Sequence, residues 1–383
     1  MGRMLVLLVL VLLVILMMMV VVIVMRTCLD TMQDEYIRRR FRLSRQAIIH
    51  LYALIEERLR PTTGRSHAVP GMVKLLATLY ILGRGSFQTI SGIICGLGQP
   101  TVSRVFTQAI LAIKSLAPRF VHFPQTEREW RDVKLAFYNR AGFPNILGAV
   151  DCTHIALQPP RLEERTYRNR KQYHCLNVQI VHDATQKIMS VRANFPGSTL
   201  DAFILRQSGV SRRFERGQFP HGWLVGDAGY PQHAWLMAPI RYPQLDTTVP
   251  AEARYNSALR RTRAVVETTI GLLKARFLCL ARPGGELLYS PRKCARIILV
   301  CCILHNLCRE RHESWHMNEE MEPEIIGALL IVIDDGSTLL DYVILHLIYI
   351  VGFFVVEGMW SASSDISQMT VLMVQTSFLF ISY

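Results

Sequence analysis

Hydrophobic positions in the first part of the chain recur with the period of an α-helix. Over residues 34–61 the apolar residues Ile48, Leu51 and Ile55 are spaced three or four positions apart, which places them on one side of a helix. A second apolar run predicts a further helix over residues 70–82. We therefore expect an all-α region before the first strand.

A tight turn separates two short predicted helices in residues 86–113. Gly96 and Gly98 mark the turn, and a proline follows at the first position of the helix expected over 101–113. The polar side of that helix holds Ser103, Arg104, Thr107 and Gln108. This arrangement is typical of a helix-turn-helix. The alternative is a helical bundle that packs without contacting DNA.

Strand-like patterns begin at residue 145. The stretch NILGAVDCTHIAL (145–157) opens with an apolar run, and residues 175–183 and 187–197 alternate as a β-hairpin does. A further short strand is expected in WLVGDAGYP (223–231). Residues 260–277 then have the pattern of a long amphipathic helix. This mixture predicts an α/β fold.

The expected strands and helix provide three acidic residues as candidates for a metal site. Asp151 and Asp227 each end an apolar strand, and Glu267 lies at the edge of the apolar stripe of the last helix. Carboxylates at neighbouring strand ends, with one from a covering helix, can hold two divalent ions for phosphoryl chemistry. Each acid also has a structural alternative: Asp151 and Asp227 as turn residues, and Glu267 as the partner of Arg263.

Charge is unevenly distributed along the 383 residues. The net charge is +13, but residues 26–320 carry 42 basic and 23 acidic residues, whereas residues 321–383 carry seven acids and no Lys or Arg. A basic body favours a polyanionic partner, either nucleic acid or an anionic membrane surface. The alternative is a basic soluble domain with no such partner. Nine cysteines without regular spacing favour a reducing compartment.

Both ends of the chain differ from its middle. Residues 4–25 are uninterrupted apolar residues, and as a helix they would extend about 33 Å, enough to cross a bilayer. They predict a transmembrane helix, and the arginines after it would leave the body in the cytoplasm. The alternative is that residues 1–25 and 325–383 are not genuine parts of the protein, but products of rearrangement or of gene prediction.

Six stretches, in order, resemble the Harbinger (PIF/Harbinger) transposase family, most closely its vertebrate transposase-derived nucleases. They are GAVDCTHIAL, YRNRKQYHCLNVQIVHD, NFPGSTLDAFIL, WLVGDAGYP, RYNSALRRTRAVVETTIGLLKARFLCL and CCILHNLC. The resemblance implies an α/β, ribonuclease-H-like DDE domain that hydrolyses DNA phosphodiester bonds. It assigns the catalytic triad to Asp151, Asp227 and Glu267, with Asp201 as a fourth metal-site carboxylate and Mg²⁺ or Mn²⁺ as the metal.

The expected organisation has four parts. They are an apolar segment (1–25), a helical DNA-binding region (26–125), the DDE endonuclease domain (140–310) and an acidic and apolar tail (311–383). The resemblance implies DNA as partner, a separate Myb-like DNA-binding protein, and a homo-oligomer as a further option. It implies the nucleus, with the cytoplasm as a second location; a membrane anchor through 4–25 is the alternative. A catalytically silent DNA-binding adaptor is the alternative function.

Basic residues provide candidate DNA contacts. In YRNRKQYH (167–174) they alternate with aromatic residues, a composition that suits phosphate contacts and base stacking. The alternative is a solvated loop, which can have the same composition. The nucleic-acid-binding candidates are Arg104, Arg168, Arg170, Lys171, Arg263 and Lys274.

The stretch CCILHNLC leaves two alternatives open. Cys301, His305 and Cys308 would share one helical face, as zinc ligands can. The surrounding residues are apolar, so we favour a buried core helix. The chain has neither a nucleotide-binding glycine loop nor a serine nucleophile motif, which argues against ATP use and esterase chemistry.

Overall fold

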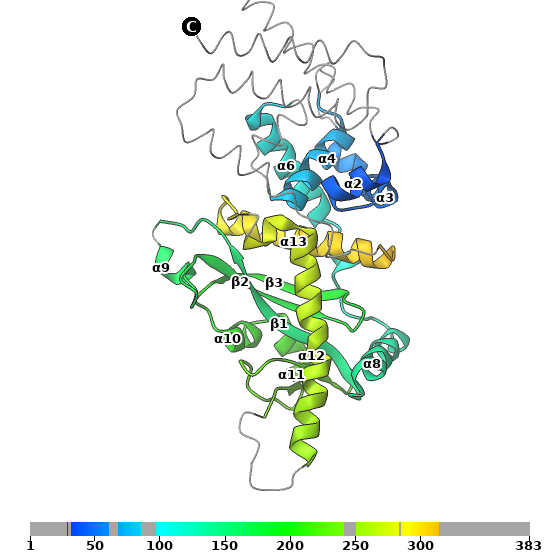
Figure 1. The fold of residues 1–383 in the computed structure, drawn as a ribbon, viewed down its shortest axis with the longest axis vertical. Coiled ribbons are helices and arrows are strands. Elements are labelled where there is room, and N and C mark those ends of the chain that lie inside the picture. Colours follow the sequence, from blue (N-terminus) through cyan, green and yellow to red (C-terminus); the bar gives the residue numbers. More distant parts are fainter. Residues whose placement is uncertain are drawn as a thin grey trace, which may run out of the picture. The chain divides into compact units, whose positions relative to one another are not determined.

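A computed structural model gives the fold of this chain (Figure 1). It describes residue 29 and residues 32–60, 68–85, 97–161, 163–240, 250–282 and 285–313, without the side chains of residues 250, 251 and 263–267. All of these residues belong to one compact unit.

Six helices precede the sheet in the described part of the chain. They are α2 (Asp34–Phe41), α3 (Arg45–Leu59), α4 (Gly71–Arg84), α6 (Gln99–Lys114), α7 (Ala117–Phe120) and α8 (Glu127–Ala141). Local sequence sets their ends. The Ser44 hydroxyl caps α3 by accepting from the Ala47 amide, and Gly85 ends α4 in the left-handed region, with φ of 68°.

A five-stranded mixed sheet forms the centre of the α/β part. The strands are β1 (Ile146–Ala156), β2 (Cys175–His182), β3 (Ile188–Pro196), β4 (Trp223–Val225) and β5 (Leu236–Met237). Their order is β3-β2-β1-β4-β5, with β1, β2 and β3 antiparallel and β4 and β5 parallel to β1. The α/β prediction and the predicted hairpin are confirmed, and this sheet is consistent with a DDE endonuclease domain.

Helices cover both faces of the sheet. The remaining elements are α9 (Glu164–Tyr167), α10 (Asp201–Arg206), α11 (Gly209–Glu215), α12 (Pro250–Arg276), η1 (Leu278–Leu280) and α13 (Pro291–Glu310). Ile155 of β1 shares a core with Leu273 of α12, whereas Val150 packs with Leu205 of α10 and Val210 of α11. Since side chains alternate along a strand, positions 150 and 155 face opposite sides. Figure 1 shows α12 lying lengthwise across the sheet.

The N-terminal helices are not separated from the rest by a solvated gap. Buried residues of α3, α4 and α6 belong to the same hydrophobic cluster as those of β2 and α13. The ring of Phe106 in α6 stacks on Tyr289, with 5.7 Å between ring centroids. The helical region therefore depends on α13 to bury part of its apolar surface.

The predicted polar side of α6 is only partly exposed, because Ser103, Thr107 and Gln108 are half-buried. The Thr107 hydroxyl accepts a hydrogen bond from Lys293 of α13 (3.1 Å), and the Gln108 side-chain oxygen accepts one from Lys74 (3.0 Å). These two hydrogen bonds join α6 to α13 and to α4. Arg104 remains exposed. Residues 86–96 lie outside the described residues, so the helix-turn-helix itself stays a prediction.

The prediction of a transmembrane helix needs correction. Within the described ranges, every helix is too short or too polar to cross a bilayer. The apolar segment 4–25, on which that prediction was based, lies outside the described residues, as does the tail beyond residue 313.

Helix α13 is a core helix, as favoured above. Cys301, His305 and Cys308 are each at most 1% exposed. The His305 Nε2 lies 2.9 Å from the Gln186 carbonyl oxygen, so this ring nitrogen is already used in a hydrogen bond within the protein. Among the described side chains, no group of three His, Cys, Asp or Glu residues is arranged to hold a metal ion. Cys301, His305 and Cys308, the possible zinc ligands, are among those side chains.

Candidate active site

Strand pairing brings two of the predicted catalytic acids together. β1 and β4 are parallel, and Ala149 is paired with Val225 in the last register pair. Asp151 lies two residues beyond Ala149, and Asp227 lies two residues beyond Val225. Asp151 is inside β1, which continues to Ala156, so the prediction that it ends its strand is wrong, whereas Asp227 does follow the end of β4. The two acids therefore belong to neighbouring, parallel-paired segments, whose strands are about 4.8 Å apart at the last register pair. Both are half-buried.

Local turns orient these two carboxylates. The Asp151 Oδ1 accepts a hydrogen bond from the Cys152 amide (2.8 Å). The chain turns after β4, where the Asp227 Oδ1 accepts from the Gly229 amide (2.9 Å). A side chain at position 226 is excluded, because its Cβ would fall 2.8 Å from the Tyr230 ring. Asp227 is therefore a turn residue, as the structural alternative held, and it follows the strand that pairs with β1.

Asp201 is held by a buried asparagine of β2. The Asn177 Nδ2 donates to the Asp201 Oδ1 (2.7 Å) and to the Thr199 carbonyl oxygen (2.8 Å). Asn177 is 1% exposed and is paired with His154 of β1. This contact fixes the carboxylate at the start of α10 against the sheet.

A thiol and a phenol lie near Asp151 and Asp201. The Cys152 Sγ is 3.3 Å from the Tyr230 hydroxyl oxygen. Burial, followed by the negative charge of Asp201, raises the pKa of Cys152 far above its ordinary value. Cys152 is thus protonated near neutral pH and is unsuited to act as a nucleophile. Burial also raises the pKa of Tyr230, and Asp201 and Asp151 add to that shift.

Glu267 belongs to the helix that crosses these strands. Two turns later on α12, the Lys274 Nζ donates to the His154 carbonyl oxygen of β1 (3.0 Å). Seven residues span nearly two helical turns, so Glu267 lies on the same side of α12, about 10 Å along its axis. The side chains of Glu267 and Arg263 lie outside the described residues.

The basic loop after α9 differs in part from its prediction. Arg168, Arg170 and Lys171 are exposed, as DNA contacts would need. The expected stacking surface is wrong for Tyr167, which is 7% exposed. Tyr173 is half-buried, and the Arg282 guanidinium lies 4.5 Å from the centroid of its ring. Tyr167 packs in the core and Tyr173 contacts Arg282, and the sequence pattern reveals neither of these contacts.

Among the candidate DNA contacts whose side chains the structure describes, Lys274 is the most buried. Burial lowers its pKa, and the charge of Lys171 lowers it further. Lys171 and Lys274 therefore lie near enough to repel each other, which indicates a positive region beside β1. Burial likewise lowers the pKa of His154, whose ring lies edge-to-face with Tyr173.

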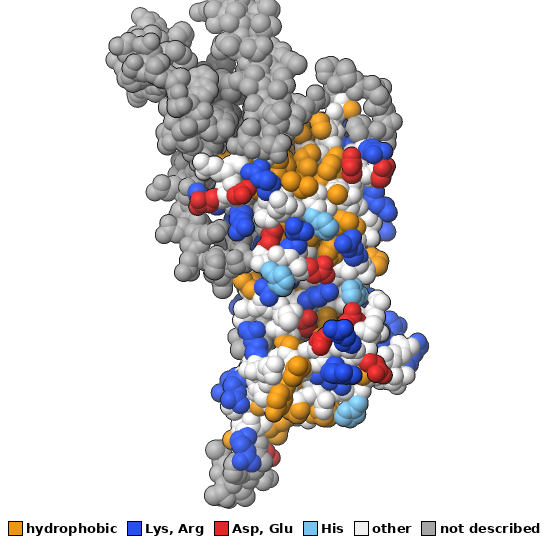
Figure 2. All heavy atoms as spheres, turned by 90° about the vertical axis from the view of Figure 1, so that its right-hand side faces the viewer, with side chains coloured by type: hydrophobic (Ala, Val, Ile, Leu, Met, Phe, Trp, Pro, Cys, Tyr) orange, Lys and Arg blue, Asp and Glu red, His pale blue; other side chains and the backbone are white. Residues whose placement is uncertain are grey.

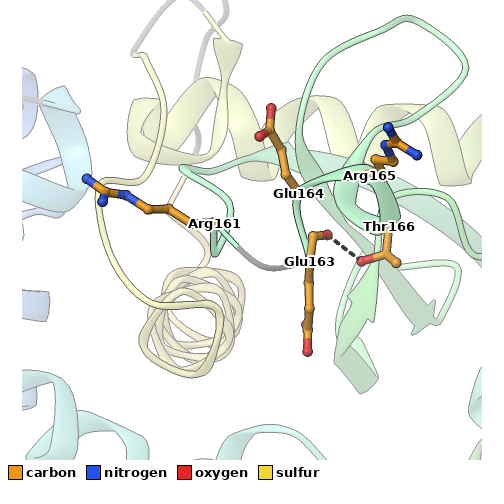
Figure 3. Close-up of a pocket in the computed structure, with 5 residues that line it drawn as sticks. All are labelled: Arg161, Glu163, Glu164, Arg165 and Thr166. Carbon is orange, nitrogen blue, oxygen red and sulfur yellow. Dashed lines mark hydrogen bonds between the residues drawn. The ribbon is translucent and has the colours of Figure 1, made fainter.

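Surface charge alone does not locate the site. Figure 2 shows Lys and Arg side chains spread along one whole face of the described part, with Asp and Glu among them. A pocket of about 240 Å³ lies beside α9, lined by Arg161, Glu163, Glu164, Arg165 and Thr166 (Figure 3). It contains none of the predicted site residues, and its own acids and bases partly offset one another.

Comparisons with known proteins show the family of this chain. The family described as DDE superfamily endonuclease matches residues 150–306, a range that includes all four predicted acids. The rat protein "Putative nuclease HARBI1" is 40% identical over 282 residues, which cover 74% of this chain and 80% of that protein. The chain belongs to the Harbinger transposase-derived nuclease family.

Other relatives of this Harbinger-family chain extend beyond mammals. The Xenopus laevis protein of the same name is 37% identical over 300 residues, covering 77% of this chain and 85% of that protein. The Arabidopsis thaliana protein named "Antagonist of like heterochromatin protein 1" is 26% identical over 291 residues, covering 70% and 71%. No solved structure gives a significant match.

Sequence reasoning missed Asn177, Cys152 and Tyr230. A signal for Asn177 was present, because an amide inside the apolar run CLNVQIV must find a buried partner. Nothing in the local sequence identifies Asp201 as that partner, since the two residues meet only through the placement of α10 on the sheet.

Proposed function

We propose that this Harbinger-family protein is a metal-dependent DNA endonuclease whose catalytic residues are Asp151, Asp227 and Glu267. The parallel pairing of β1, which contains Asp151, with β4, which Asp227 follows, carries the proposal. The crossing of the same strands by the helix of Glu267 supports it. In the proposed reaction a water oxygen forms a bond to the DNA phosphorus, the P–O3′ bond breaks, and a proton passes to the leaving 3′ oxygen.

The chemistry of the donor set suits a hard divalent ion, but the described aspartates Asp151, Asp201 and Asp227 are not by themselves arranged to hold one, so the proposed metal site needs Glu267 as well. Half-exposed carboxylates are the ligands that Mg²⁺ and Mn²⁺ prefer. Asp151, Asp227 and Glu267 would hold the metal, with Asp201 as a fourth carboxylate oriented by Asn177. When bound, such ions activate the attacking water and stabilise charge on the leaving oxygen. The chain's own acids then fix where that chemistry takes place.

The basic residues would position DNA. Arg168, Arg170 and Lys171 are exposed on the loop before β2, and Lys274 lies beside β1. Such contacts neutralise phosphates without reading base sequence. We place Arg104 and Arg263 in the same role, with Arg104 on the exposed part of α6. DNA as substrate implies a nuclear location, and a Myb-like partner would supply sequence recognition.

The first test uses the full chain and supercoiled plasmid. We expect nicking with Mg²⁺ or Mn²⁺ and none with a chelator. Asp227→Asn and Glu267→Gln should each lower the nicking rate by at least about 100-fold, because a dismantled metal site loses several kcal/mol of transition-state stabilisation. DNA binding should remain.

Asp132→Asn is the matched control, since Asp132 is an exposed carboxylate on α8. It should nick as the parent does. Equal nicking by Asp227→Asn and the parent would refute the site. Binding without nicking, in the parent and with either metal, would favour the catalytically silent adaptor. Terminal DNA of Harbinger-type elements, tested in parallel, would show whether the sequence of the substrate matters.

A further inference from the structure

A partly exposed aromatic pair, Phe195 and Phe203, lies beside Asp201. Phe203 of α10 is 40% exposed, although phenylalanine is usually buried. Its ring meets that of Phe195 in β3 edge-to-face, at 6.3 Å between centroids and 87° between planes. Leu200, at the start of the same helix, is 59% exposed. This apolar surface is therefore open to solvent.

A guanidinium group lies beside each ring of the pair. The Arg206 guanidinium lies 5.2 Å from the centroid of the Phe203 ring, and that of Arg192 lies 6.0 Å from the centroid of the Phe195 ring. Within the described ranges neither arginine forms a salt bridge. Their charges thus remain available to a polyanion.

The pair is tied to the candidate active site by two connections. Phe203 is two residues after Asp201 on the same short helix. Phe195 is the cross-strand partner of Asn177, which donates a hydrogen bond to the Asp201 carboxylate. Neighbouring β-strands are about 4.8 Å apart, so Phe195 is one strand away from the residue that holds Asp201, and a DNA strand that reaches Asp201 would pass near the aromatic pair.

Aromatic rings with adjacent arginines are what proteins use to bind unpaired bases. The base stacks on the ring or on the guanidinium, and the charge meets the phosphate. A base inside a duplex cannot offer its face in this way. We propose that Phe195 and Phe203, together with Arg192 and Arg206, bind an unpaired base of the DNA strand next to the cleavage site.

The inference rests on the proposed function for its placement, since the cleavage site is that of the proposed nuclease. Its consequence is substrate preference: DNA with unpaired bases near the cut should bind more tightly than a continuous duplex. The preference is expressed in binding, before any bond is broken, so it can be measured without metal.

The test measures binding of the full chain, in chelator, to two labelled DNAs of equal length and charge. One is a continuous duplex, and the other has three unpaired bases at its centre. Phe203→Ala should weaken binding to the DNA with unpaired bases by about 5- to 100-fold, the effect of losing one base–aromatic stack. Binding to the continuous duplex should change less than about twofold.

Two further variants separate stacking from general effects. Phe203→Tyr keeps a ring and should restore the preference. Leu135→Ala removes a side chain that is 55% exposed on α8, outside this cluster, and should bind both DNAs as the parent does. Fluorescence of 2-aminopurine at the unpaired position should be quenched by the parent and by Phe203→Tyr, but not by Phe203→Ala.

Equal binding of both DNAs by the parent, or an unchanged preference in Phe203→Ala, would overturn the inference. An outcome of that kind with normal metal-dependent nicking would leave the nuclease proposal standing. Loss of preference in Phe203→Ala, in a protein that never nicks, would support the base-binding surface and refute the nuclease.

Discussion

Asn306 joins three parts of the fold through one buried amide. From α13, its Nδ2 donates to the Phe120 carbonyl oxygen of α7 and to the Ile188 carbonyl oxygen of β3, both at 2.7 Å. Its Oδ1 accepts from the Ile188 amide at 2.8 Å. Asn306 is 0% exposed, so water cannot replace these bonds. The amide links the helical region, α13 and the edge of the sheet.

Replacement of Asn306 by alanine should destabilise the protein by about 3–5 kcal/mol. The substitution leaves three buried backbone groups without partners, and each unsatisfied group costs about 1–3 kcal/mol, less some relaxation. Urea denaturation of the full chain, followed by far-UV circular dichroism, measures the free energy of unfolding.

Cys302→Ala is the matched control for this experiment. Cys302 is on the same helix, is equally buried, and packs in the hydrophobic cluster. Its loss removes one sulfur atom and should cost about 1 kcal/mol. If Asn306→Ala costs no more than Cys302→Ala, the three hydrogen bonds do not hold the parts together and the reasoning is refuted.

Three further predictions concern stability. Gly197→Ala should lower the free energy of unfolding by about 2 kcal/mol in urea titration, because the added Cβ would fall 2.5 Å from the Tyr167 carbonyl oxygen; an unchanged midpoint would contradict this. Thr126→Ala removes the capping box of α8 and should cost about 1 kcal/mol, seen as a lower melting temperature; no shift would show that the cap is dispensable. Burial lowers the pKa of His182 to about 4 and that of His305 to about 3, so the unfolded chain takes up protons first, near pH 6.5. Stability should be complete above pH 6.5 and decrease below it, by about 2 kcal/mol per histidine at pH 5, and equal stability at pH 7.5 and pH 5 would rule this out.

Local patterns were sufficient for most of the secondary structure. Alternation predicted the hairpin at 175–183 and 187–197, and β2 and β3 form it. The helical period predicted α4 within two residues of its ends, but it did not show that the helical stretch 34–61 is divided into α2 and α3. These elements follow from the sequence because a period of two or of 3.6 residues decides which side chains can be buried together.

Side-chain environments were predicted less well. The polar side of α6 was expected at the surface, yet Thr107 and Gln108 bond to Lys293 and Lys74. Helical periodicity separates polar from apolar positions, but it cannot tell solvent from a polar group on another helix. The same limit applies to Tyr167, an aromatic residue in a basic loop that packs in the core.

The sequence by itself determined the kinds of residue at the candidate site: two acids after apolar strands and one on a long helix. Only the tertiary structure decided that Asp151 and Asp227 are neighbours, since their strands are separated in the chain by β2 and β3 and meet through parallel pairing. It also decided that Asn177 holds Asp201. The physical reason is that register and helix placement depend on how all the apolar surfaces pack together, and no local stretch contains that information.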